Sequence, residues 1–274
     1  SSNSTGSWNT AIGTAAMKNS VTGEQNTAVG ADAMQNNTAS YNTAVGDEAM
    51  RSNEGGTDNT AIGNDALWGN TSGSNNTALG SDALTSNISA GNNTAVGQMA
   101  LYYNETGSSN TAVGRTALHS IVGGSNNTAV GREAGYNLTG YYNTISGVQA
   151  GYGATSGTDN TGNYQSVFGY TAGYYNTPGA DNAFFGDFSG YQNTSGNNNT
   201  FLGSEAGRDN TSGSQNAFVG ERAGYFNQEG YNNSFLGRGA GYNNLNGYAN
   251  TFVGHDAGLN NYLGTRNTFV GRAT

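Results

Sequence analysis

The chain has no cysteine, one proline and one lysine, Lys18, in 274 residues. The lack of cysteine excludes disulfide bonds and thiolate metal sites. Charged residues make up 10% of the chain and hydrophobic residues 34%, and both shares are low for a globular domain. The chain therefore has too little apolar material for the thick core of an ordinary globular enzyme.

Long hydrophobic runs and an excess of positive charge are also missing. No run of 18 apolar residues occurs, so we expect no membrane-spanning segment and no membrane insertion. Nine basic residues face 18 acidic ones, which gives a net charge of −9. An acidic surface repels phosphate groups, so nucleic acid and anionic membranes are excluded as partners.

Glycine, in contrast, is abundant, at 45 of 274 residues. It does not occupy every third position, and proline is almost absent, so a collagen triple helix is excluded. Aromatic residues make up 11% of the chain, and lysine and glutamate are few, which argues against disorder. The composition favours a regular fold with many turns.

A short motif, Asn-Thr-Ala-Val-Gly, recurs along the chain and carries most of the information in the sequence. We count positions from the Asn of each copy, which we call the anchor and number 0. Twelve of the intervals between anchors are 17 residues, two are 16 and one is 22. The anchors are Asn9, Asn26, Asn42, Asn59, Asn76, Asn93, Asn110, Asn127, Asn143, Gln165, Asn182, Asn199, Asn216, Asn233, Asn250 and Asn267.

A unit of this length is too short for a helix pair or a propeller blade, but it suits one coil of a β-solenoid. We therefore predict an all-β fold, a parallel β-solenoid (β-roll or β-helix) of about sixteen 17-residue coils. The repeat fills residues 1–274, which predicts a single repeat domain with no second domain. The long interval predicts a surface loop inserted at about residues 153–163.

Stacked coils place equivalent residues in columns, and two columns change together along the chain. Early coils have Leu or Met at position 8, whereas later coils have Gly there, usually followed by Tyr. In the later coils the Ala at position 2 becomes Phe. One column shrinks where the other grows, so we interpret the two halves as variants of one close-packed cross-section. We also expect the anchor Asn column to be held by amide bonds between side chains.

The motif has two neighbouring apolar residues, at positions 2 and 3, which point to opposite faces of a strand. Either the strand bends at a corner, so that both columns enter one core, or the second column packs against identical chains. In the second case three-fold packing would also protect the edges of a thin solenoid.

The strings Asn26-Thr-Ala-Val-Gly-Ala-Asp-Ala33 and Asn59-Thr-Ala-Ile-Gly-Asn-Asp-Ala66 resemble the head repeats of trimeric autotransporter adhesins. They are also similar to the β-solenoid shafts of bacteriophage tail fibres. The resemblance extends from Asn9 to Gly271, although the adhesin repeat is shorter. It implies an extracellular homotrimeric fibre, on a cell surface or a virion, that attaches to a surface through a glycan or a protein receptor.

Catalytic and metal chemistry find little support in the pattern. The two histidines, His119 and His255, lie eight coils apart, and no catalytic triad can be assembled from columns, so we predict that the chain is not an enzyme. We expect no cofactor. An acidic column stands at position 6, in Asp32, Glu48, Asp65, Asp82, Glu133, Glu205 and Asp256. Its carboxylates either splay into solvent or bind Ca²⁺.

Two further columns are candidate binding surfaces. Tyrosines at position 9 would form an aromatic ladder that either binds sugars or proteins or stacks on itself and covers the Gly column. They are Tyr136, Tyr152, Tyr174, Tyr191, Tyr225 and Tyr242. The Thr column at position 1 suggests an ice-binding surface. However, Thr shares a face with the aliphatic column, so we expect the Thr side chains to point inward.

These observations predict a structural and adhesive extracellular fibre segment whose partner is a second and third copy of the chain. Two alternatives remain open. One is a monomeric solenoid that binds ice or glycans, and the other is a subunit of a self-polymerising filament.

Overall fold

A computed structural model describes residues 5–153 and 161–273. It confirms the prediction of an all-β parallel solenoid with coils of about 17 residues: sixteen strands and no helix occur among the described residues. The chain divides into two compact units, Ser1–Glu133 and Ala134–Thr274, which we call unit 1 and unit 2. Most of the predicted loop at 153–163 falls on residues 154–160, which lie outside the described residues.

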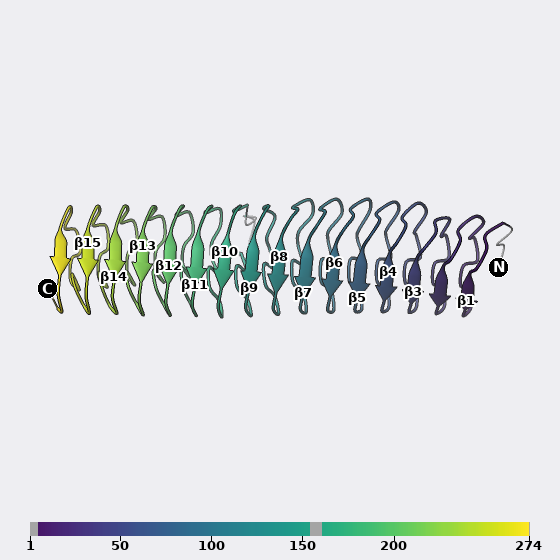
Figure 1. The fold of residues 1–274 in the computed structure, drawn as a ribbon, viewed down its shortest axis with the longest axis horizontal. Helices are drawn as coiled ribbons and strands as arrows, with labels where there is room; N and C mark the ends of the chain where they lie inside the picture. Colours follow the sequence, from purple (N-terminus) through teal and green to yellow (C-terminus); the bar gives the residue numbers. More distant parts are fainter. Residues whose placement is uncertain (1–4, 154–160, 274) are drawn as a thin grey trace. The chain divides into compact units, whose positions relative to one another are not determined.

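Each unit holds eight of the described strands, one per coil, and within a unit they lie side by side in chain order (Figure 1). Unit 1 contains β1 (Thr10–Ile12), β2 (Thr27–Val29), β3 (Thr43–Val45), β4 (Thr60–Ile62), β5 (Thr77–Leu79), β6 (Thr94–Val96), β7 (Thr111–Val113) and β8 (Thr128–Val130). Unit 2 contains β9 (Thr144–Ser146), β10 (Ser166–Phe168), β11 (Ala183–Phe185), β12 (Thr200–Leu202), β13 (Ala217–Val219), β14 (Ser234–Leu236), β15 (Thr251–Val253) and β16 (Thr268–Val270).

The strands pair in parallel with no change of register, so equivalent positions of successive coils are partners. Thr43, Ala44 and Val45 pair with Thr60, Ala61 and Ile62, for example. The backbone hydrogen bonds continue beyond the strands, because the N–H of Glu48 donates to the carbonyl of Ala31 at 2.9 Å and that of Met50 to Ala66 at 2.9 Å. Every coil therefore satisfies its backbone through its neighbours.

The strand ends at a glycine that no other residue can replace. Gly63, at position 4 of its coil, has a φ of +140°, and a Cβ there would lie 2.4 Å from the carbonyl oxygen of Gly80 in the next coil. Turns after this glycine use the left-handed region even where side chains are present, as at Asp65 (φ 52°) and Leu67 (φ 56°). Such residues ordinarily avoid this region, so the stacking of coils imposes it.

The core of each coil is a thin strip, and the two predicted cross-sections are both present. In unit 1 the strip is built from Ala at positions 2 and 7 and Met or Leu at position 8, and these are buried in the coils of β2 to β7. In unit 2 buried Phe rings at position 2 stack on one another, with centroids 4.8 Å apart between Phe201 and Phe218. A Cβ at Gly224 would lie 2.3 Å from Phe218, so the ring fills the space that Leu or Met takes in unit 1. The predicted exchange of volume is confirmed.

Asparagine holds the coils together in two columns rather than one. At the anchor column, Asn42 N–H donates to Asn26 Oδ1 at 2.9 Å, and its own side-chain amide donates to the carbonyl of Gly56 at 2.9 Å. The predicted bond between side-chain amides occurs in this column at Asn127, whose Nδ2 donates to Asn110 Oδ1 at 3.1 Å, but at Asn42 the side-chain donor goes to a backbone carbonyl. Both groups of the anchor amide are nevertheless satisfied within the buried strip.

The amide ladder occurs instead at position 11, in a second buried column that the sequence analysis missed. Asn70 Nδ2 donates to Asn53 Oδ1 at 2.6 Å, and Asn87 Nδ2 donates to Asn70 Oδ1 at 2.7 Å. In the coil after Asn104 this position is Ile121, and the buried Asn104 Oδ1 has no hydrogen-bond partner among the described residues. The ladder stops where an apolar residue replaces its next donor.

We predict that Asn70→Ala lowers the free energy of unfolding by about 1–3 kcal/mol, because Asn53 Oδ1 is then buried without a donor. Urea unfolding followed by circular dichroism measures the change. Asn64→Ala is the control, because Asn64 is exposed and its effect should stay within about 0.5 kcal/mol. Equal effects of the two substitutions would show that the ladder is not stabilising.

The exchange of volume is tested in unit 2 by converting one coil to the cross-section of unit 1. Phe218→Ala should destabilise by about 3–5 kcal/mol, and Gly224→Leu should destabilise because its side chain meets the Phe218 ring. The double variant should be more stable than the sum of the two costs predicts, by at least about 1 kcal/mol. Leu is tolerated in this backbone conformation at Leu67, so additive costs would contradict a shared space.

Candidate functional site: the surface columns

The outward face of the strands in unit 1 is an uncharged array of two parallel columns. Position 3 carries Val, Ile or Leu in every coil, and position 1 carries Thr in every coil. The aliphatic side chains are exposed or half-exposed rather than covered, with exposed fractions of 39% at Ile62 and 43% at Leu79. Along one strand the two columns stand about 7 Å apart, and successive coils are about 4.8 Å apart.

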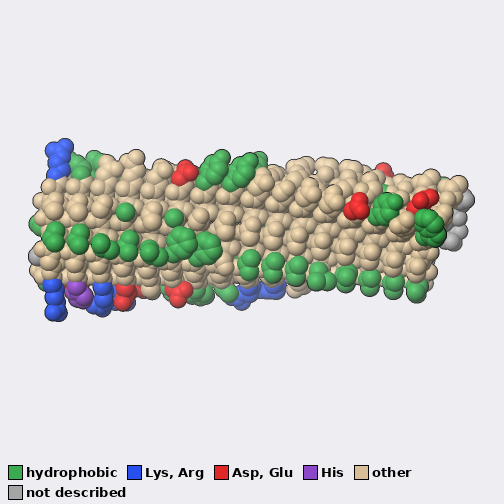
Figure 2. All heavy atoms as spheres, in the orientation of Figure 1, with side chains coloured by type: hydrophobic (Ala, Val, Ile, Leu, Met, Phe, Trp, Pro, Cys, Tyr) green, Lys and Arg blue, Asp and Glu red, His purple; other side chains and the backbone are tan. Residues whose placement is uncertain are grey.

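Unit 2 keeps the apolar column except at Ser146, but it keeps only half of the threonines. Position 3 carries Phe168 and Phe185, whose rings stack with centroids 4.9 Å apart, and then Leu or Val in the coils that follow. Leu202 and Leu236 are exposed by 49% and 53%. Position 1 changes to Ser or Ala in four coils, for example at Ser166 and Ala183. Figure 2 shows a row of hydrophobic side chains on each unit.

This geometry tests two of the expectations about the strand. The strand does not bend to bring both apolar columns into one core, because the residue at position 2 is buried while its neighbour at position 3 is open to solvent. The expectation that Thr points inward is wrong. Thr does share a face with the aliphatic column, as alternation requires, but that face is the outer one.

The position 9 tyrosines of unit 2 form a stacked ladder. Ring centroids are 5.1 Å apart for Tyr136 and Tyr152, 4.8 Å for Tyr152 and Tyr174, and 5.4 Å for Tyr174 and Tyr191. Tyr225 and Tyr242 stack at 5.0 Å. The structure therefore brings the predicted tyrosines of neighbouring coils together, and whether they bind a ligand stays a prediction.

Arg208 takes the place of a ring between Tyr191 and Tyr225. Its guanidinium lies 5.9 Å from the centroid of Tyr191 and 5.3 Å from that of Tyr225, and it donates a hydrogen bond to the Tyr225 hydroxyl. The planar cation thus continues the stack between its neighbours. Because stacking covers the ring faces inside the ladder, the ladder presents mainly ring edges and hydroxyl groups to solvent.

A row of alternating charges runs beside the end of this ladder at positions 5 and 6. Arg222 pairs with Glu205, Arg238 lies 3.4 Å from Glu221, and His255 lies 2.9 Å from Asp256. Interaction with Glu205 raises the pKa of Arg222. Sequence reasoning placed Glu205 and Asp256 of this row in a column, but it missed Glu221 and the arginines, because the partners stand in neighbouring coils.

The acidic column of unit 1 is partly neutralised by neighbours from other columns. Glu48 accepts hydrogen bonds from Trp68 Nε1 at 2.8 Å and from Arg51 at 2.9 Å, and these contacts, that to Trp68 first, lower its pKa. Burial raises the pKa of Asp65, and the nearby charges of Glu48 and Asp82 raise it further. In the described part of the chain, no three His, Asp or Glu side chains are grouped so that they could hold a metal ion.

The two histidines occupy different surroundings in different units. His119 in unit 1 stacks on Tyr102 with ring centroids 5.4 Å apart, and burial lowers its pKa. His255 in unit 2 belongs to the charged row. In residues 5–153 and 161–273, no helix is long and apolar enough to cross a membrane.

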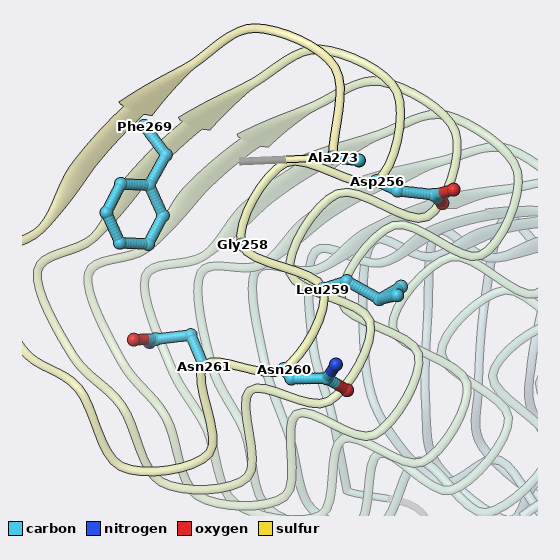
Figure 3. A pocket seen from close by; sticks show the side chains of 7 residues that line it. All are labelled: Asp256, Gly258, Leu259, Asn260, Asn261, Phe269 and Ala273. Carbon is cyan, nitrogen blue, oxygen red and sulfur yellow. The ribbon is translucent and has the colours of Figure 1, made fainter.

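Two hollows lie near the last coils of unit 2. The larger, about 410 Å³, is lined by Asp256, Gly258, Leu259, Asn260, Asn261, Phe269 and Ala273, shown as sticks in Figure 3. In preceding coils the following coil occupies the equivalent place. The smaller, about 260 Å³, is lined by Arg222, Arg238, Gly239, Tyr242, Asp256 and Leu259. It joins the end of the tyrosine ladder to the charged row.

Comparison with known proteins adds no relative to this description. No protein-family model matches the chain, and no curated protein matches it significantly.

The raised pKa of Asp65 predicts how its substitution changes the free energy of unfolding at different pH values. A carboxyl group whose pKa is higher in the folded state destabilises that state once it is ionised, so Asp65→Asn should raise the free energy of unfolding at pH 7. The gain should vanish as the pH falls below about 4, where Asp65 is protonated in both states. Unfolding curves across this range measure it.

Asp58→Asn is the matched control, because Asp58 directly precedes the anchor of the Asp65 coil, is exposed and also has a positive φ. It removes the same charge with the same backbone preference. A gain for Asp58→Asn equal to that for Asp65→Asn would mean that net charge, and not the surroundings of Asp65, causes the effect.

Proposed function

We propose that this chain is a segment of an extracellular structural and adhesive fibre, on a cell surface or a virion, in which three copies pack through the position 3 column. The observation that carries the proposal is the outward-facing apolar column, interrupted at Ser146, on strands whose other face is already buried. An exposed apolar ridge of this extent is typical of an interface.

The chemistry of the face favours a second copy as the occupant. No charged residue stands at positions 1 or 3 in any coil, so like copies meet there without repulsion. The column repeats with the spacing of the coils, and the chain itself is a partner with the same spacing. Side chains of adjacent copies can then interdigitate coil by coil, as identical columns do in stacked sheets.

The resemblance of the repeat to adhesin heads and tail-fibre shafts supports the trimeric and extracellular parts of the proposal. Adhesion is supported by the tyrosine ladder and charged row of unit 2, which lie at positions 5, 6 and 9 and not on the strand face. Packing of copies through the strands therefore leaves this second surface available to a receptor.

Ice binding is a second candidate, favoured by the outward threonines. In unit 1 an unbroken Thr column runs beside the aliphatic one, and such an array of methyl and hydroxyl groups can order water. Unit 2 departs from this pattern with Ser and Ala at position 1, whereas its apolar column continues. The feature common to both units is the apolar column, which favours packing over ice binding.

The test is the absolute mass of the chain in solution, measured by light scattering. We expect three times the chain mass of 28.1 kDa, and the double variant Leu79→Asp, Val113→Asp should reduce it to 28.1 kDa without loss of β-structure. Both side chains lie on the outer face, so the coil interior is unchanged.

The matched control is Ile88→Asp, Val122→Asp, because these residues are equally exposed aliphatic side chains that do not belong to the strands. It should keep the mass of the wild type. A monomeric wild type would overturn the trimer, and thermal hysteresis in that sample, lost in Thr77→Lys, would favour ice binding. Mass that grows without limit would favour the filament.

A further inference from the structure

The stacked geometry of the tyrosine ladder restricts where a ligand can lie against a ring face. Inside the ladder each face is covered by the next ring or by Arg208. Tyr242 stacks on Tyr225 on one side, but the next coil carries Leu259 at the same position. Tyr242 also lines the smaller hollow of unit 2. The end of the ladder is therefore the place where a hollow opens beside a ring, with Leu259 instead of another ring in the next coil.

The hollow exists because one side chain is missing. Every other coil has a side chain at position 6, and only the coil of β14 has glycine there, Gly239. The equivalent residues of the neighbouring coils, Arg222 and Asp256, stand on either side of the gap and line it. Asp256 leans into the gap, because its Oδ1 would lie 2.2 Å from a Cβ on Gly239.

The groups around the hollow offer both donors and acceptors at close range. Arg222 and Arg238 are donors only, the carboxylate of Asp256 is an acceptor, and the Tyr242 hydroxyl can be either. The two arginines are already paired with Glu205 and Glu221. An anion would meet Asp256 and two neutralised guanidinium groups, and a cation would meet the arginines, so neither charge is favoured.

We propose that this hollow binds one ring of a neutral saccharide. An aromatic face with an aliphatic neighbour suits the apolar side of a sugar ring, and mixed donors and acceptors suit its hydroxyl groups. The volume of about 260 Å³ lies below the range of drug-sized pockets and suits a single ring. The inference rests on the adhesive part of the proposed function and names its ligand class.

The test is a titration of the full chain with the methyl glycosides of glucose, galactose and mannose, followed by saturation-transfer NMR. We expect at least one glycoside to bind in the millimolar range, and Gly239→Asn to weaken it by at least about tenfold. Asn fills the gap but keeps the backbone, since Arg222 and Asp256 adopt the same left-handed conformation at this position. Tyr242→Leu should weaken binding similarly.

Tyr152→Leu is the matched control, because Tyr152 is stacked on both sides and should not affect binding. Failure of all the glycosides to bind, or binding that Gly239→Asn leaves unchanged, would overturn the site. Stronger binding of glucuronate or glucosamine than of the neutral sugars would overturn the ligand class.

Failure of this inference can be told apart from failure of the fibre. Leu79 and Val113 belong to unit 1 and the hollow to unit 2, so the variant that dissociates the trimer should still bind the glycoside. A trimer without sugar binding contradicts the site alone, and a monomer that binds the sugar contradicts the trimer alone.

Discussion

The hydrogen bonds between successive coils are the constraint on which the rest of the structure depends. A three-residue strand is too short to be stable alone, and its N–H and C=O groups find partners only in the coils on either side. Because the register never shifts within a unit, each position is held above its equivalent. Side chains can then vary only as columns, and the backbone must accept left-handed conformations at Asp65 and Leu67 to keep the register.

The thin interior follows from the same constraint. A coil with one buried column from its strand has room for one large side chain, which stands at position 8 in unit 1 and at position 2 in unit 2. Polar groups share this narrow space, so every buried amide needs a fixed partner. The two asparagine columns supply these partners, and the unpaired oxygen of Asn104 marks the coil where the position 11 column is interrupted before it resumes at Asn176.

The features that repeat along the chain could be predicted from the sequence. Whether a given column points into the coil or out to solvent could not. The coil length, the parallel stacking and the exchange between Phe218 and Gly224 follow from spacing and volume alone. Alternation placed Thr with the aliphatic column, but it does not say which face is inside. The second asparagine column was missed because it lies in the variable part of the repeat and is interrupted at Ile121. The hollow at Gly239 depends on neighbours in adjacent coils. Among 45 glycines, the sequence alone does not show that Gly239 is the one that opens a hollow.

The backbone at position 6 has a consequence for how such a surface changes over evolutionary time. This turn holds Asp65, Arg222 and Gly239 in the same conformation, so a codon change there alters the surface without altering the coil. Each coil thus contributes one side chain at position 6 that can be exchanged, and the backbone sets the spacing of these side chains at about 4.8 Å. The solenoid therefore presents side chains at a fixed spacing, and each of them can be exchanged without a change in its neighbours along the column.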